Sequence, residues 1–255
     1  MLALIEKIQD SINIARETFN IDEFPGNLFL LFEKEECADK HGLLLFKENI
    51  NKLSGFIGYG DNNLTVICIN YQRPIGHQNF TLAHELGHWF LHRGQNISDI
   101  DCNLNIQESI EGEANNFASE LLYPEKLIVQ DYHDICEKDL LNIDKRKELA
   151  IYINGLCHKY CLSFQMVLRK ILYKDYQLNK YKEIRNEIDK SLGMKISKYF
   201  DEDFYVPNPN LPEYQQLKKP YVVLEERLDK LIELKKIGKA TADAIKLRNG
   251  IEIDN

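Results

Sequence analysis

The five residues His84-Glu85-Leu86-Gly87-His88 combine two imidazoles and a carboxylate at the spacing HExxH. On a helix, residues four positions apart lie one turn apart on the same face, so both imidazoles can bind one metal ion. Glu85 then lies beside the metal, where its carboxylate can take a proton from a water molecule and later deliver it to a leaving amine. The motif therefore predicts a zinc-dependent hydrolytic centre with Glu85 as the general base.

The residues around this motif favour a metal site over a helix whose histidines merely face solvent. The segment is otherwise mostly apolar, which does not fit an ordinary exposed helix surface. Its apolar residues are Phe80, Leu82, Ala83, Leu86, Trp89, Phe90 and Leu91. We therefore predict that this helix packs inside the protein and that His84 and His88 bind a metal ion.

A catalytic zinc ion needs a third protein ligand and one open coordination position. The extended pattern of the metzincin proteases is excluded, because Leu91 and Gly94 occupy the positions of its glycine and third histidine. His92 shares a face with His88, but it lies one further turn along the helix, about 6 Å beyond it. We interpret His92 as a residue that packs beside the metal ligands, with ligation as the weaker alternative.

The acidic stretch at 108–125 offers two candidates for the third ligand, Glu111 and Glu113. Two residues apart on a helix, these side chains point about 200° away from each other, so at most one of them faces the metal. Their helix has an apolar stripe formed by Ile110, Ala114, Phe117, Ala118 and Leu121. The two glutamates lie on opposite flanks of this stripe, and periodicity leaves the choice between them open.

Two sequence runs together carry a family resemblance. The run TLAHELGHWFLH at 81–92, followed by EGEANNFASELLYP at 111–124, resembles the ImmA/IrrE family of zinc metallopeptidases. The similarity extends over roughly residues 40–175 and includes a strand ending in asparagine at 67–70 and a later helical pair, LCHKYCLSFQMVLRKIL. In this family the glutamate directly before Ala-Asn is the third zinc ligand, which implies Glu113.

The resemblance implies a zinc-dependent endopeptidase that cleaves a helix-turn-helix transcriptional repressor and so relieves repression in a mobile-element, stress or defence setting. His84, His88 and Glu113 would hold Zn²⁺, and Glu85 would act as the general base. The alternative is a non-proteolytic, zinc-containing regulatory module that binds a repressor or nucleic acid. A Glu85→Gln variant distinguishes the two, because only a peptidase needs the carboxylate.

Other residues could act at the same site. Cys102 lies between the two motif segments, and its thiolate could occupy the open zinc position and hold the enzyme inactive. A free cysteine in a loop is the simpler interpretation. A side chain that polarises the substrate carbonyl could come from Tyr123, Tyr71, His92 or His133, and the sequence does not choose among them.

Charge is unevenly distributed along the chain. The 255 residues carry a net charge of -8; residues 1–130 contain 9 basic and 19 acidic side chains, and residues 131–255 contain 23 and 21. This balance argues against a nucleic-acid coat or a membrane-surface protein. An acidic first half suits a basic, DNA-binding substrate protein. Residues 156–198, with 10 basic and 4 acidic side chains, could contact nucleic acid, although a solvated helix face is the simpler interpretation.

Nothing in the sequence indicates export or membrane insertion. No stretch approaches the roughly 20 apolar residues that span a bilayer. Glu6 and Lys7 interrupt the N-terminal segment where a secretory signal would stay apolar, and the six cysteines form no CxxC pair. We therefore expect a cytoplasmic protein with reduced thiols.

These residues need a scaffold of helices and short strands. Apolar periodicity predicts helices at 3–18, 27–42, 79–92, 109–122, 147–174 (two, around Ser163), 176–192, 221–236 and 241–248, and strands at 43–46, 55–59 and 64–70. The turn at 60–63 makes the last two strands a hairpin. We predict an α+β fold in which a small antiparallel sheet packs on a zincin-like HExxH helical core, with a helical C-terminal extension. An extended substrate is expected to pair beside the strand at 64–70.

The chain is expected to contain four segments. A zincin-like metallopeptidase domain at 1–130 is followed by a helical extension with a helix-turn-helix cadence at 131–200. A Pro-rich linker at 201–220, marked by four prolines, leads to a helical tail at 221–255.

Overall fold

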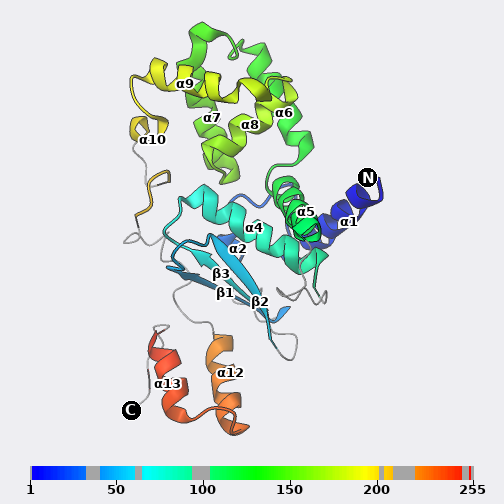
Figure 1. Ribbon diagram of the computed structural model, residues 1–255, viewed down its shortest axis with the longest axis vertical. Coiled ribbons are helices and arrows are strands. Elements are labelled where there is room, and N and C mark those ends of the chain that lie inside the picture. The colour runs from blue at the N-terminus through cyan, green and yellow to red at the C-terminus, as the bar shows by residue number, and fades with distance from the viewer. Residues whose placement is uncertain are drawn as a thin grey trace. The chain divides into compact units, whose positions relative to one another are not determined.

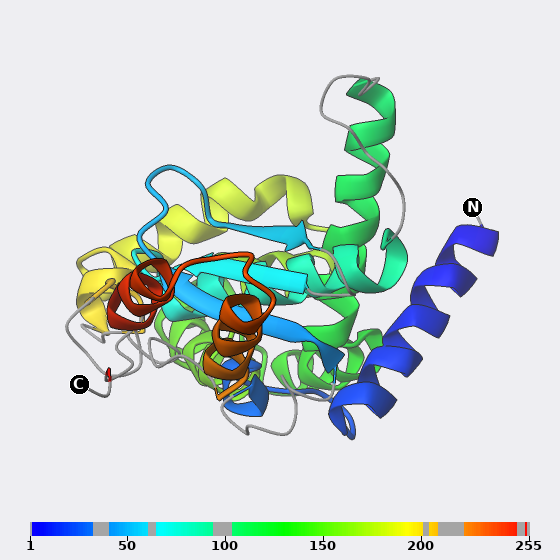
Figure 2. The same ribbon diagram turned by 90° about the horizontal axis from the view of Figure 1, so that it is seen from below.

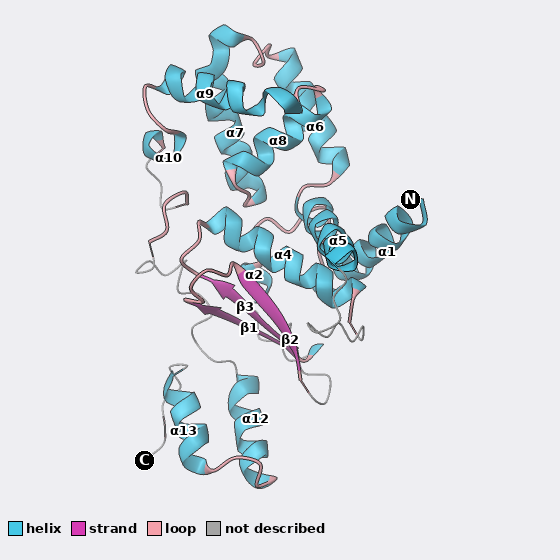
Figure 3. Cartoon of the chain, in the orientation of Figure 1, coloured by secondary structure: helices cyan, strands magenta, loops and turns pink. Residues whose placement is uncertain are grey.

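The part of the chain that the structure describes contains many helices and one small sheet. The computed structural model describes residues 2–32, 41–60, 65–93, 104–200, 204–208, 222–248 and 253. Helices predominate, and three short strands form the sheet (Figures 1 and 3). The α+β class predicted from the sequence is confirmed.

The chain divides into two compact units. One contains residues 1–27 and 73–207, and the other contains residues 28–72 and 208–255. The first unit holds both the HExxH helix and the acidic helix, and the second holds the sheet. The boundaries of the four expected segments stay a prediction.

Three helices of the first unit surround the motifs. Helices α1 (Leu2–Phe19), α4 (Ile75–Leu91) and α5 (Leu104–Leu122) pack against one another (Figures 1 and 2). Their buried apolar side chains follow the three- and four-residue spacing of the sequence. They include Ile8, Ile12, Ala15, Leu82, Leu86, Ala114, Phe117 and Leu121.

A glycine lets α4 and α5 approach each other closely. A Cβ atom on Gly87 would lie 3.1 Å from the backbone Cα and O atoms of Ala114 and 3.2 Å from a ring carbon of Phe117. These distances are shorter than ordinary van der Waals contacts, so a side chain at this position would push the two helices apart. Gly87 belongs to the HExxH motif, and the close approach therefore lies within the motif itself.

The first turn of α4 is fixed by contacts with distant segments. A Cβ atom on Gly76 would lie 2.5–2.6 Å from backbone atoms of residues 162–163, so only a glycine fits there. The side-chain amide of Asn79 donates hydrogen bonds to the carbonyl oxygens of Gly26 (2.8 Å) and Cys161 (3.0 Å). Asn79 is fully buried, and these bonds supply the partners that a buried amide requires.

The helical extension predicted after residue 130 is present. It consists of α6 (Glu125–Glu137), α7 (Arg146–Tyr160), α8 (Phe164–Lys174), α9 (Tyr181–Leu192) and α10 (Ile196–Tyr199), with 3₁₀ turns at Ile143–Lys145 and Leu178–Lys180. Helix α8 packs against α6 and α7, and α9 packs against α7. The helix expected at 176–192 begins only at Tyr181, because Tyr176 has a left-handed backbone (φ 54°) that a helix cannot contain.

The two helices expected around Ser163 are confirmed. Cys161 ends α7 in the left-handed conformation (φ 52°), and the Ser163 hydroxyl accepts a hydrogen bond from the backbone N–H of Met166 at 3.2 Å. This is the arrangement of a serine N-cap, and it starts α8.

The three strands form a mixed sheet. Strands β1 (Leu43–Glu48), β2 (Gly55–Tyr59) and β3 (Thr65–Asn70) are ordered β1-β3-β2. The predicted antiparallel pairing of β2 with β3 is confirmed, but β1 pairs with β3 in parallel. The expectation of a wholly antiparallel sheet is therefore corrected. The near-continuous apolar run of β1 is typical of a parallel strand that is buried on both faces.

Strand β3 is the central strand of the sheet. Leu45 of β1 and Ile57 of β2 both lie opposite Ile67 of β3. Both edges of β3 are therefore used by neighbouring strands. This contradicts the expectation that an extended substrate pairs beside residues 64–70. Within the described residues, the outer strands of the sheet are β1 and β2.

The remaining predictions concern residues 27–42 and 201–248. The helix expected at 27–42 contains a short helix α2 (Phe29–Phe32), and residues 33–40 lie outside the described residues, as does most of the linker at 201–220. The closing helical hairpin is confirmed by contacts between α12 (Val222–Glu233) and α13 (Lys239–Arg248).

We expect Ser163→Ala to destabilise the protein by about 1 kcal/mol, because it removes the N-cap of α8. Equilibrium unfolding in denaturant would measure this loss. Ser191→Ala, at a serine whose hydroxyl donates within its own helix to the carbonyl of Ile188, serves as the control. Equal stability of the Ser163→Ala variant and the wild type would contradict the importance of this cap.

Candidate metal centre

Helix α4 brings the two histidines of the motif together. Nε2 of His84 and Nε2 of His88 are 3.0 Å apart, and the rings meet edge to face. Their side chains are only 16% and 13% exposed. Both nitrogens therefore point toward the same small region on one side of α4, as the HExxH spacing predicted.

A carboxylate from α5 completes the group. The two carboxylate oxygens of Glu111 lie 3.1 Å from Nε2 of His84 and 3.4 Å from Nε2 of His88. Their potential ligand atoms all lie within 4.8 Å of one another. Glu111 is half-exposed, so the group is open to solvent on the side of α5.

The spacing of these three side chains fits a zinc ion. Ligands at about 2.1 Å around a tetrahedral ion lie about 3.4 Å from one another. The observed separations are 3.0, 3.1 and 3.4 Å. Lone-pair atoms this close together repel one another unless a shared proton or a positive charge lies between them. The donor set, two imidazoles and one carboxylate, therefore suits a cation with one coordination position left open.

Glu113, the third ligand implied by the family resemblance, has different partners in the structure. Its Oε2 atom accepts a hydrogen bond from Nζ of Lys7 at 2.9 Å and lies 3.3 Å from Nε2 of His92. A two-residue step turns the side chain by about 200° around the helix axis. Because α5 is oriented with Glu111 toward the two motif histidines, Glu113 points toward Lys7 and His92 instead.

Asn115 is a site residue that sequence reasoning missed. It follows Glu111 by one helical turn, and its Oδ1 atom lies 3.1 Å from Nδ1 of His84. A ring N–H that donates to Asn115 leaves the lone pair of Nε2 on the side of Glu111. The four-residue spacing between Glu111 and Asn115 is the sequence signal that could have identified both residues.

Burial determines the protonation of two groups of the centre. Burial, together with the neighbouring His84 and His92, lowers the pKa of His88 to about 4. Its ring is therefore neutral at neutral pH and can offer a lone pair to a metal. Glu85 is buried, and burial together with the charge of Glu111 raises the pKa of its carboxyl to about 7.

His92 lies beside a histidine of the group. Its Nδ1 atom is 3.0 Å from Nδ1 of His88, and its side chain is only 3% exposed. Burial lowers the pKa of His92, although the hydrogen bond to Glu113 acts in the opposite direction. For Glu113, burial acts to raise the pKa, but the hydrogen bonds from Lys7 and His92 outweigh it and the net shift is downward.

Tyr123 is more deeply buried than a side chain that donates a hydrogen bond to a substrate would be. It is fully buried, and its hydroxyl donates to Oδ2 of Asp131 at 2.8 Å. The hydroxyl of Tyr160 donates to the same oxygen at 2.7 Å, and the two tyrosine rings stack. Burial and the charge of Asp131 raise the pKa of Tyr123. The Tyr123 hydroxyl is therefore engaged by Asp131, and its suggested role toward a substrate stays a prediction.

The other candidates add no further donor to the group. Cys102 lies outside the described residues. Among the described cysteines, Cys68, Cys157 and Cys161 are buried and Cys136 is exposed. His133 belongs to a separate set of potential ligand atoms on α6, with Asp134 and Glu137. All three side chains of that set are exposed, as is usual for charged groups on a helix surface.

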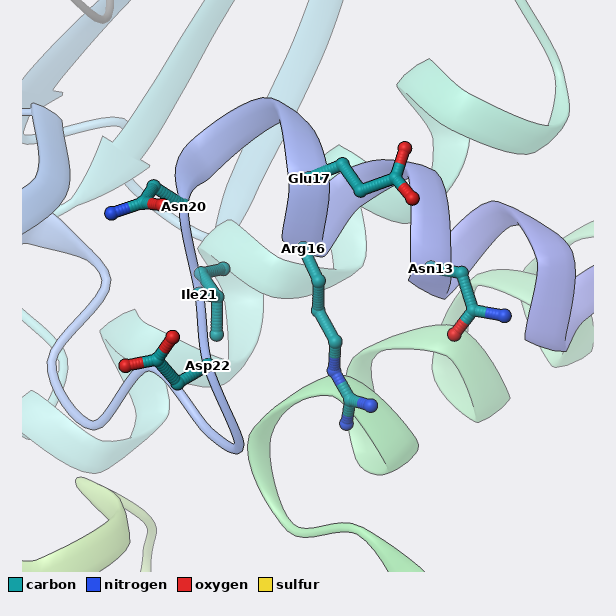
Figure 4. Close-up of a pocket in the computed structure, with 6 residues that line it drawn as sticks. All are labelled: Asn13, Arg16, Glu17, Asn20, Ile21 and Asp22. Carbon is teal, nitrogen blue, oxygen red and sulfur yellow. The ribbon is translucent and has the colours of Figure 1, made fainter.

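A hollow of about 400 Å³ lies at the C-terminal end of α1 (Figure 4). It is lined by Asn13, Arg16, Glu17, Asn20, Ile21 and Asp22. None of these residues belongs to the metal centre. Figure 4 shows the side chains of Arg16 and Glu17 extending in different directions, so the lining groups do not converge on a common point.

Several cations of the basic stretch at 156–198 contact groups of the protein itself. The guanidinium of Arg169 lies 5.0 Å from the ring centre of Tyr181, and Arg185 pairs with Asp189 at 2.7 Å. Such internal contacts reduce the charge that is available to a phosphate backbone. Contact between this stretch and nucleic acid stays a prediction.

Comparison with known proteins agrees with the chemistry of this centre. Residues 38–172, more than half of the chain, match the IrrE N-terminal-like domain, a peptidase family. This chain belongs to that family. The matched segment of the IrrE N-terminal-like domain includes α4, α5 and their three-residue metal group, and the family resemblance predicted from the sequence is confirmed.

A curated relative points the same way. Over 94 residues the chain is 30% identical to the metallopeptidase ImmA of Bacillus subtilis. The alignment includes 36% of this chain and 55% of the relative, so it spans about half the length of that protein. A member of the IrrE N-terminal-like family with such a relative is expected to use a metal ion.

None of the described helices combines the length and the apolar character needed to cross a bilayer.

We expect Glu111→Gln to weaken zinc binding by more than about 100-fold, because the loss of a direct ligand exceeds the 10- to 100-fold effect of a group that contacts a ligand. Glu113→Gln keeps a hydrogen-bond acceptor and should weaken it by about 10-fold or less. Competition with a chromophoric chelator measures both affinities. The opposite ranking would return the third-ligand role to Glu113.

We expect Tyr123→Phe to lower the free energy of unfolding by about 1–2 kcal/mol, because it removes one of the hydrogen bonds to the buried Asp131 carboxylate. Zinc affinity should not change. Tyr173→Phe, at an exposed tyrosine, provides the matched control. A Tyr123→Phe variant with native stability but weakened zinc binding would place Tyr123 at the centre after all.

Proposed function

We propose that this chain is a zinc-dependent endopeptidase in which His84, His88 and Glu111 hold the metal and Glu85 is the general base. The observation that carries the proposal is the convergence of two imidazole nitrogens and a carboxylate, 3.0–3.4 Å apart, in a chain that belongs to a peptidase family. The relative in Bacillus subtilis is itself named a metallopeptidase.

Each residue of the centre has a distinct task. A zinc ion, when bound, supplies a Lewis acid that polarises the scissile carbonyl and acidifies water. Glu85 takes the proton of the attacking water and passes it to the leaving amine. Glu85 directly follows His84 in the chain, and the negative charge of Glu111 contributes to raising the pKa of its carboxyl group. Asn115 keeps the ring of His84 in the orientation in which Nε2 faces the metal.

The substrate that we propose is a helix-turn-helix transcriptional repressor, cleaved in a mobile-element, stress or defence context in the cytoplasm. The family resemblance supports this choice. The charge of the chain supports it as well, because residues 1–130 contain 19 acidic side chains against 9 basic ones. The surface with which a protein binds DNA is basic, so the encounter of such a surface with this region would be accelerated electrostatically and weakened by salt.

We expect Glu85→Gln to slow repressor cleavage by at least about 100-fold while leaving zinc binding intact, because general-base catalysis contributes factors of this size. The assay mixes the zinc-loaded, full-length chain with the purified product of a neighbouring repressor gene and follows the fragments by mass spectrometry. Glu148→Gln, at an exposed position on α7, is the matched control.

The same assay tests the competing function, a regulatory module that binds its partner without cutting it. If the zinc-loaded wild type forms a complex with the repressor but yields no fragments, the peptidase proposal fails and the binding module replaces it. Cleavage at the wild-type rate by Glu85→Gln would refute the role of Glu85.

A further inference from the structure

A row of hydrogen-bonded side chains leads from the metal centre to helix α1. Nδ1 of His88 lies 3.0 Å from Nδ1 of His92, and Nε2 of His92 lies 3.3 Å from Oε2 of Glu113. The same oxygen of Glu113 accepts a hydrogen bond from Nζ of Lys7 at 2.9 Å. The row therefore joins α4, α5 and α1, which also pack against one another.

Burial increases along the row from Lys7 to His92. The side chain of Lys7 is 44% exposed, that of Glu113 is 13% exposed and that of His92 is 3% exposed. A ring as deeply buried as His92 must have partners for both of its nitrogens. His88 and Glu113 are these partners. The ring of His92 is thus held on both sides, and Glu113 is held in turn by the lysine.

The partners also impose a direction on each hydrogen bond. If Nε2 of His88 offers its lone pair to a metal, the proton of this neutral ring is on Nδ1. The Nδ1–H group of His88 then donates a hydrogen bond to Nδ1 of His92. The ring proton of His92 is therefore on Nε2, and this N–H group donates to Glu113. Glu113 accepts from both His92 and Lys7. Every bond in the row is therefore compatible with metal binding by His88.

The outer end of the row lies outside the segment that defines the family. The family match covers residues 38–172, whereas α1 contains residues 2–19. Lys7 approaches the centre only because α1 packs against α4 and α5. The contribution of α1 is therefore a property of this chain's own tertiary structure.

We propose that His92, Glu113 and Lys7 are positioning residues of the metal centre and that helix α1 is a functional part of it. Glu113, which the family resemblance suggested as a ligand, acts instead through His92 on the orientation and tautomer of His88. This inference rests on the metal site of the proposed function. Groups that orient a metal-binding histidine typically contribute a factor of 10–100 to metal affinity.

The test measures zinc affinity of the full-length chain by competition with a chromophoric chelator. We expect Lys7→Met to raise the dissociation constant for Zn²⁺ about 10-fold and His92→Phe to raise it about 10- to 100-fold. Lys7→Arg keeps the charge and the donor, and it should restore affinity to within about 3-fold of the wild type. The visible absorption of the Co²⁺-loaded protein should change in Lys7→Met and return in Lys7→Arg.

Lys126→Met is the matched control. Lys126 forms an ion pair with Glu23 at 3.2 Å, on the same unit but with no residue of the metal centre, and both side chains are exposed. A partly exposed ion pair contributes little to folding stability. The metal-free forms of both lysine variants should therefore melt at the wild-type temperature, and only Lys7→Met should lose zinc affinity.

Two results would overturn the inference. One is equal zinc affinity in Lys7→Met, Lys126→Met and the wild type. The other is a parallel loss of zinc affinity and metal-free melting temperature in Lys7→Met, which would reduce Lys7 to a structural role. Failure of the proposed function looks different, because the wild-type chain itself would then either bind no zinc or bind zinc and yield no repressor fragments.

Discussion

The close contact of α4 with α5 at Gly87 and Ala114 is the constraint on which the metal centre depends. His84 and His88 lie on either side of Gly87 in the chain, and Glu111 precedes Ala114 by one helical turn. A glycine facing an alanine lets two helix backbones approach more closely than larger side chains would. The carboxylate of one helix thereby comes within 3.1–3.4 Å of the imidazoles of the other.

Buried polar contacts hold these two helices at their ends. Asn79, near the start of α4, binds backbone carbonyls that lie 53 and 82 residues away in the chain. Tyr123, directly after α5, donates to Asp131 beside Tyr160 of the helical extension. A fully satisfied buried network fixes one geometry, because any displacement leaves a polar group without a partner. The extension therefore supports the centre without contributing a metal-binding atom among the described residues.

The parts of this architecture that depend on local spacing could be predicted. The HExxH turn placed His84 and His88 together, and Ser163 marked the start of α8. The pairing of β1 with β3 could not be predicted in the same way, because an apolar run such as LLLF is compatible with either strand direction. Periodicity also left Glu111 and Glu113 undecided, and the family resemblance selected the residue that the structure pairs with Lys7.

The sequence by itself determined the chemistry available to this protein: two histidines one turn apart, an adjacent glutamate, an acidic second helix and membership of a peptidase family. Only the tertiary structure decided which carboxylate faces the histidines and that Lys7, 106 residues from Glu113, joins the surroundings of the centre. The physical reason is that local spacing orients side chains relative to their own helix. The rotation and approach of one helix relative to another result from the packing of many distant side chains.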